Sequence, residues 1–206
     1  MVELFLSAFV TLFVVIDPPG CAPIYASLTG DARPEDRRAM AIRACTIAGL
    51  ILLFFLLAGQ NVLAALHIEL NAFRIAGGIM LFLIALDMVF EKRTARREQR
   101  AEKVRDDPDY EDVSVFPMAM PMLAGPGAIA SVMLLQSTAE SLIGTLVVLA
   151  ALAAVLALTL LALLAAAPLM RLFGTRVEAV LTRLLGVLLA ALAAQYVIDG
   201  LRGSFP

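Results

Sequence analysis

Long apolar segments are the feature that most constrains how this chain can fold. Six of them stand out, at residues 2–28, 41–66, 70–90, 115–138, 142–170 and 177–198. A helix needs about 20 apolar residues to cross the hydrocarbon core of a bilayer, and in lipid only helices and closed barrels satisfy every backbone polar group. The segments therefore predict an all-α fold, a polytopic membrane helix bundle with six transmembrane spans.

The composition agrees with this fold and excludes several function classes. Of the 206 residues, 61% are hydrophobic and 17% are charged, against about 45–50% and about 25% in ordinary soluble domains. A soluble enzyme and a disordered chain are excluded, and a net charge of −2 gives nucleic-acid phosphates no attraction. One histidine, His67, and two cysteines in apolar segments, Cys21 and Cys45, form no metal-binding motif. We expect no enzymatic activity, no cofactor, no metal and no nucleic-acid partner.

Lysine and arginine are distributed unevenly between the two ends of the spans. Thirteen of the 16 lie in or beside the loops after the first, third and fifth segments, whereas the opposite side has only Arg202. Loops rich in these residues stay in the cytoplasm. We therefore expect a multi-pass plasma-membrane protein with both termini on the non-cytoplasmic side. Residues 1–4 lack a basic stretch and a cleavage site, so the first span is expected to be retained.

The segment 91–114 separates two groups of three spans. It carries seven basic and eight acidic residues, which nearly cancel, and we interpret it as a solvated cytoplasmic linker with a turn at Asp107-Pro108-Asp109. Residues 1–90 then form a first three-span unit and residues 115–206 a second.

The two units share motifs at nearly equal offsets. Asp17-Pro18-Pro19-Gly20 matches Ala124-Gly125-Pro126-Gly127 at an offset of 107, and Arg74-Ile75-Ala76-Gly77 matches Arg183-Leu184-Leu185-Gly186 at 109. Because three spans per unit is an odd number, the second unit would enter the membrane from the opposite side. This arrangement is an inverted-topology repeat, which is common in secondary transporters. The alternative is that these glycines and prolines simply kink unrelated helices.

The first and fourth spans are predicted to be broken near mid-membrane. Pro18 and Pro19 have no N–H group and clash with the preceding turn. Each break would leave a helix N-terminus whose first-turn N–H groups, at 21–24 and at 127–129, attract anions, and freed carbonyls that accept from a cation. Donors and acceptors together suit a zwitterion such as a free amino acid. The candidate binding residues are Asp17, Pro18, Gly20, Cys21, Gly125, Gly127, Ala128, Ile129 and Ser131.

Asp17 is the only acidic residue deep in a span, where a charge is costly and needs a functional or paired reason. It is a candidate for binding a substrate ammonium group or for coupling to a proton gradient. The alternative is that Asp17 caps the half-helix that follows it.

These motifs resemble the MarC family of bacterial inner-membrane proteins, also classed as six-span transporters of small neutral amino acids. The similarity covers essentially the whole chain, and its most specific part is Pro117-Met118-Ala119-Met120-Pro121 followed by Ala124-Gly125-Pro126-Gly127. The resemblance implies transport of glycine or alanine coupled to H⁺ or Na⁺, and a distant likeness to LysE-type exporters. This chain has Cys21 where much of the family has Asn, and the family tolerates Asn at the position of Asp17.

Taken together, the sequence predicts a secondary transporter whose two units rock about a midplane site. It carries no Walker motif, so we expect no direct use of ATP. The expected partners are the lipid bilayer, a small amino acid, a coupling ion and, through the Ala- and Leu-rich fifth segment, a second copy of the chain. The alternatives are a non-transporting membrane scaffold or regulatory protein, and an exporter of another small metabolite.

Overall fold

The computed structural model describes residues 1–90, 92–105, 112–139 and 141–205. These residues form helices and no strands, which confirms the all-α prediction. In chain order the elements are α1 (Val2–Ile16), α2 (Pro18–Leu28), α3 (Pro34–Ala65), α4 (Leu70–Val89), α5 (Lys92–Arg105), the irregular helix η1 (Ser114–Leu123), α6 (Pro126–Thr138), α7 (Leu142–Leu164) and α8 (Ala166–Ser204).

Five stretches of the described chain are long and apolar enough to cross a membrane, and a bent pair of helices makes a sixth if it counts as one span. Five are α1 with α2, α3, α4, α7 and the part of α8 from Val180 to Ser204, and the sixth is η1 with α6, which are bent by 51° at their break. The two predicted breaks, at Asp17 and before Pro126, are therefore confirmed, and the five or six candidate spans agree with the predicted bundle of six.

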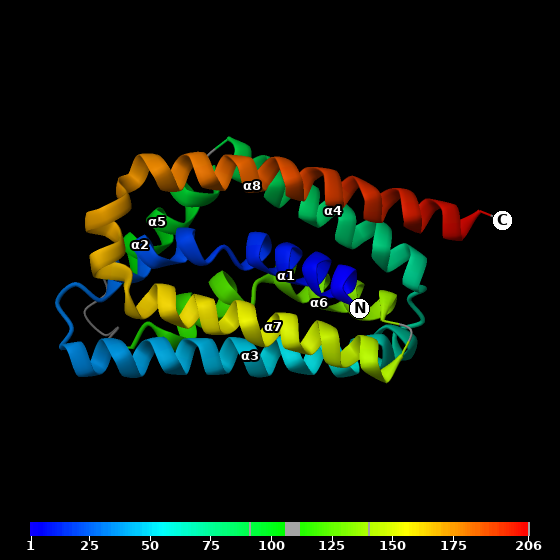
Figure 1. Ribbon diagram of the computed structural model, residues 1–206, viewed down its shortest axis with the longest axis horizontal. Coiled ribbons are helices and arrows are strands. Elements are labelled where there is room, and N and C mark those ends of the chain that lie inside the picture. The colour runs from blue at the N-terminus through cyan, green and yellow to red at the C-terminus, as the bar shows by residue number, and fades with distance from the viewer. Residues whose placement is uncertain (91, 106–111, 140, 206) are drawn as a thin grey trace.

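The predicted end of the fifth segment was wrong. The fifth apolar segment was expected to run to residue 170, but α7 ends at Leu164 and a new helix begins at Ala166. Pro168 explains the difference because it has no N–H group to offer the carbonyl of Leu164, whereas proline is tolerated in the first turn of α8. Figure 1 shows that α8 (orange to red) turns sharply near its start and then runs beside α4.

The two broken spans form the centre of the bundle. Among the five unbent candidate spans, the α1–α2 span has the largest buried fraction, and nearly all of α6 from Gly127 to Leu135 is buried. Around them, α1 packs on α7, α3 packs on η1, α6 and α7, and α4 pairs with α8 (Figure 1). Large apolar side chains cover the outside of these peripheral helices, including Leu50, Phe54, Leu57, Phe82, Leu83, Leu146, Leu184 and Leu188, as a lipid-facing surface requires.

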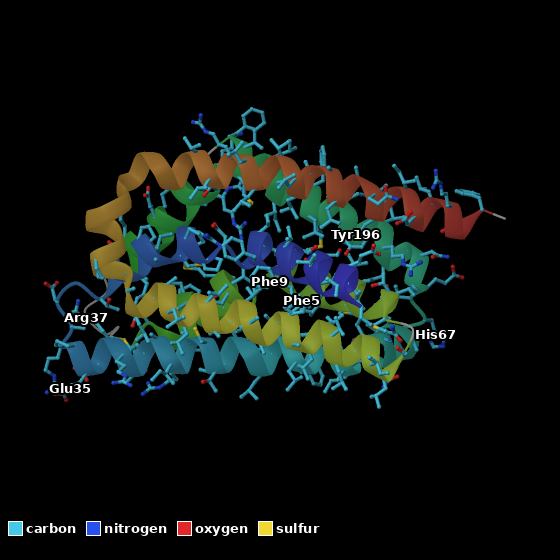
Figure 2. All side chains as sticks on the ribbon, in the orientation of Figure 1. Phe5, Phe9, Glu35, Arg37, His67 and Tyr196 are labelled. Atoms are coloured by element: carbon cyan, nitrogen blue, oxygen red, sulfur yellow. The ribbon has the colours of Figure 1, made fainter. Side chains whose placement is uncertain are left out.

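The α4–α8 pair is held together by close backbone approach. A Cβ atom on Gly78 would lie 2.8 Å from the carbonyl oxygen of Ala193, and one on Gly200 would lie 2.9 Å from that of Asn71. Small residues at such positions let two membrane helices pack closely. Polar residues gather instead at the ends of the bundle, with Glu35 and Arg37 at one end and His67 at the other (Figure 2).

Candidate functional site

The first break is closed by Asp17, which ends α1 and begins α2. Its backbone is left-handed (φ 59°, ψ 64°), and its Oδ1 accepts the N–H of Gly20 at 3.1 Å. The predicted capping role of Asp17 is therefore confirmed. The N–H of Cys21 donates to the carbonyl of Asp17 at 3.0 Å, so α2 begins earlier than expected and this amide is already engaged.

Two carbonyl groups released by the break find partners within the chain. In an unbroken helix Val15 would pair with residue 19, which is Pro19 and has no N–H. Instead, Arg93 of α5 donates its Nη2 to the carbonyl of Val15, and the thiol of Cys21 donates to the carbonyl of Ile16 at 3.4 Å. The guanidinium of Arg93 is thus hydrogen-bonded to a carbonyl that was expected to accept from a ligand cation.

Asp17 also forms a buried ion pair with α5. Its Oδ2 lies 2.8 Å from Nη1 of Arg97, and the two side chains are only 2% and 8% exposed. Sequence reasoning missed Arg93 and Arg97, because the segment 91–114 was interpreted as a solvated linker. A signal was present, since residues four apart share one face of a helix and a deep carboxylate needs a partner.

The second break leaves N–H groups in the first turn of α6 without an acceptor among the described residues. Gly125 caps α6 and accepts the N–H of Ile129 at 3.0 Å, and Pro126 has none to donate. The amides of Gly127 and Ala128 point out of the first turn of the helix without an acceptor in the described chain. One turn on, the Oγ of Ser131 is fully buried and also lacks a partner there.

A cavity of about 460 Å³ joins the two breaks and α5. Val15 from the first break and residues 125–128 from the second line it, together with α4 and the three α5 arginines, Arg93, Arg96 and Arg97. Of the predicted binding residues, Gly125, Gly127 and Ala128 therefore meet at one cavity, and Asp17 is tied to it through Arg97. Four others do not line it, namely Pro18, Gly20, Cys21 and Ile129, and Ser131 lies deeper in α6.

The cavity is basic. Arg96 pairs with Asp87 of α4, and Arg97 pairs with Asp17. Burial, and then the neighbouring Arg97, lowers the pKa of Arg93 to about 10, so this guanidinium stays protonated at neutral pH. Groups able to bind a metal ion, with three or more His, Cys, Asp or Glu side chains, are absent from the described residues.

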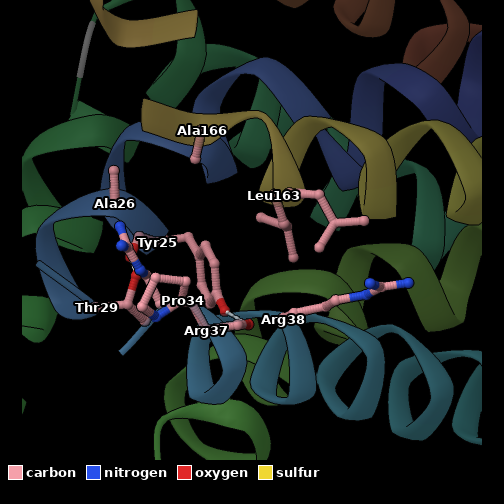
Figure 3. Close-up of a pocket in the computed structure, with 9 residues that line it drawn as sticks. Tyr25, Ala26, Thr29, Pro34, Arg37, Arg38, Leu163 and Ala166 are labelled. Atoms are coloured by element: carbon pink, nitrogen blue, oxygen red, sulfur yellow. Dashed lines mark hydrogen bonds between the residues drawn. The ribbon is translucent and has the colours of Figure 1, made fainter. Parts of the chain in front are cut away.

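A second cavity, of about 340 Å³, lies where α2 meets the start of α3 and the α7–α8 corner. Tyr25, Thr29, Arg37 and Arg38 line one side of it and Leu163 and Ala166 the other (Figure 3). The hydroxyl of Tyr25 donates to the carbonyl of Arg37, and that of Thr29 donates to the carbonyl of Tyr25 at 2.8 Å. The first bond ties the end of α2 to α3 and the second closes the C-terminus of α2, so these polar groups of the cavity have a structural role.

The fold and the site define a polytopic integral membrane protein with two interrupted helices at its centre. The family model described as "MarC family integral membrane protein" matches residues 2–205, and the chain belongs to the MarC family. The resemblance found in its motifs is thereby confirmed.

Named relatives cover nearly the whole chain. A "UPF0056 membrane protein" of Archaeoglobus fulgidus is 35% identical over 96% of this chain and 92% of its own length. The "UPF0056 inner membrane protein YhgN" of Escherichia coli is 36% identical over 96% and 95%, and the "UPF0056 membrane protein YvbG" of Bacillus subtilis is 33% identical over 100% and 98%. No solved structure matches the chain.

Proposed function

We propose that this protein is a secondary transporter of small neutral amino acids, of the glycine and alanine class. The observation that carries the proposal is that both helix breaks face one cavity. Interrupted spans at the centre of a bundle are the usual binding elements of secondary transporters, and irregular backbone at membrane depth persists where it lines a cavity.

The chemistry at the breaks suits a zwitterion. The free amides of Gly127 and Ala128 lie at the positive end of the α6 dipole and attract a carboxylate. The carboxylate of Asp17 and the carbonyl of Val15 are acceptors that already hold cations, those of Arg97 and Arg93. An ammonium group would compete for the same acceptors, so substrate binding and the α5 contacts would be linked.

The packing pattern supports an inverted repeat. In a two-fold arrangement the first span corresponds to the fourth, the second to the fifth and the third to the sixth. The two-fold operation then maps the α1–α7 pair onto the α6–α3 pair and maps the α4–α8 pair onto itself. The helices of all three pairs are in contact. Alternating access would be a rocking of the two units about the cavity.

The proposed setting is a bacterial inner membrane with both termini on the non-cytoplasmic side. The basic loops support this orientation, and the Escherichia coli relative is named an inner membrane protein. Asp17 is the proposed coupling residue for H⁺ or Na⁺, and no enzymatic step is proposed.

Counterflow in proteoliposomes tests this function. Vesicles preloaded with unlabelled alanine should accumulate radiolabelled alanine and glycine, and an imposed H⁺ or Na⁺ gradient should change the rate. Protein-free vesicles are the control. Absence of counterflow for every neutral amino acid, under both gradients and with folded protein, would reject the proposal in favour of a non-transporting role.

A further inference from the structure

Among the described residues, Arg93 is a cation whose hydrogen-bond partners are all neutral. Its Nη2 donates to the carbonyl of Val15 and its Nη1 to the thioether sulfur of Met88 at 3.0 Å, and a thioether is a weak acceptor. Among the described residues, none of the ion pairs involves Arg93. A partly buried guanidinium without a counter-ion is unfavourable, so the position favours an anion that is not part of the described chain.

The neighbouring charges do not supply that anion. The carboxylate of Asp87 is paired with Arg96 and that of Asp17 with Arg97. The described charges at and beside the cavity are therefore three guanidinium groups and two carboxylates, which leaves one positive charge in excess. One monoanionic group in the cavity would balance it.

The cavity also offers neutral donors on another wall. Arg93 lines the same cavity as Gly127 and Ala128, whose amide N–H groups are free in the described chain. A guanidinium has five N–H donors in a planar fork that fits a carboxylate bidentately, and Arg93 uses two of its groups in the contacts above. Donors from two walls and a net charge of +1 match one carboxylate group.

We propose that the cavity between α4, α5 and the start of α6 is a carboxylate-binding site in which Arg93 is the charged ligand. The identity of its occupant, the carboxylate of a transported amino acid, rests on the proposed function. The segment between the two three-span units is then a wall of the binding site as well as a connection.

Three probes separate the chemical groups. Binding to the full-length protein in lipid nanodiscs is measured by titration calorimetry with alanine, with propionate, which lacks the ammonium group, and with alaninamide, which lacks the carboxylate. The wild-type protein should bind alanine and propionate through the carboxylate group that both carry. Losing one charge-assisted bond costs a factor of roughly ten to a hundred in affinity, so Arg93→Gln should weaken both by at least about tenfold and leave alaninamide unchanged.

Arg33→Gln is the matched control. Arg33 lies at the start of α3, outside the cavity, and its exposed side chain pairs with Asp36. This variant should bind all three probes as the wild type does. An equal loss of affinity in Arg33→Gln would mean a general charge effect and would overturn the site. The site would also be overturned if the wild-type protein bound no propionate, or if Arg93→Gln bound propionate with unchanged affinity.

Arg93→Lys decides the question if the glutamine variant does not fold. It keeps the charge but loses the planar fork, so propionate affinity should fall several-fold, and wild-type affinity would overturn the proposal. Failure of the two proposals looks different. Propionate binding that depends on Arg93 without alanine counterflow rejects only the transport function, whereas wild-type alanine counterflow with an unaffected Arg93→Gln variant rejects only the carboxylate site.

Discussion

Asp17 and Arg97 lie 80 positions apart in the sequence, yet their carboxylate and guanidinium are 2.8 Å apart and almost fully buried. The pair joins the centre of the first span to α5, a helix too charged to be a membrane span itself. Because Asp17 also caps α2, one side chain both closes the break and anchors α5. The stability of the break and the position of α5 are therefore coupled.

The first prediction concerns this ion pair. Removing one partner leaves a buried charge and typically costs about 3–5 kcal/mol, so Asp17→Asn and Arg97→Gln should each lower the melting temperature markedly. Asparagine still caps a helix well, so Asp17→Asn removes mainly the charge. The double variant should lose less stability than the sum of the two single losses. Additive losses in a thermal-unfolding series would show that the two residues are not coupled.

The second prediction concerns Gly20. A Cβ atom there would lie 2.3 Å from Oδ2 of Asp17, the oxygen that Arg97 holds. Gly20→Ala should therefore displace the carboxylate and destabilise the protein by about 1–3 kcal/mol, as overpacking usually does. Gly30→Ala is the control, because its nearest contact would be an ordinary 3.7 Å. Equal melting temperatures for the two variants would contradict the cap geometry.

The third prediction concerns the α4–α8 contact. Gly78→Ala would bring a Cβ atom within 2.8 Å of the backbone oxygen of Ala193, so the helices must separate and the melting temperature should fall. Gly49→Ala meets only the flexible end of Leu156 at 3.2 Å and should have a much smaller effect. If Gly49→Ala were the more damaging variant, close backbone packing would not be what holds α4 to α8.

The fourth prediction concerns orientation. After replacement of Cys21 and Cys45 by alanine, single cysteines are introduced at Glu35 and at His67, which lie at opposite ends of the bundle (Figure 2). A membrane-impermeant maleimide should label His67→Cys in intact cells and Glu35→Cys only after lysis. The reverse pattern would invert the proposed topology.

The spans and breaks were predictable because their signals are local. Twenty apolar residues in a row, or two prolines within such a run, determine helix length and interruption without reference to the rest of the chain. Pro168 was an equally local signal for the end of α7, and overlooking it placed that boundary six residues too late.

The long-range contacts of the site could not be predicted in the same way. The sequence indicated that Asp17 needs a partner, but 16 basic residues were available, and selecting Arg97 requires knowing that α5 packs on α2. The first-turn amide of Cys21 was expected to be free because the half-helix was taken to begin after Gly20, whereas Asp17 starts it at Pro18.

Alanine binding to Gly127→Leu is the sharpest measurement of whether the paired breaks form a solute-binding site. A side chain at this position would point at Ile84, with Cβ 2.3 Å from its Cδ1, and would fill the cavity in front of the free amides. Gly30→Leu, remote from the cavity, is the control, and melting temperatures verify that both variants fold. Folded Gly127→Leu should lose at least about tenfold in alanine affinity, beyond the worth of one good hydrogen bond, while Gly30→Leu binds alanine normally. Wild-type alanine affinity in folded Gly127→Leu would contradict a solute-binding site at the breaks.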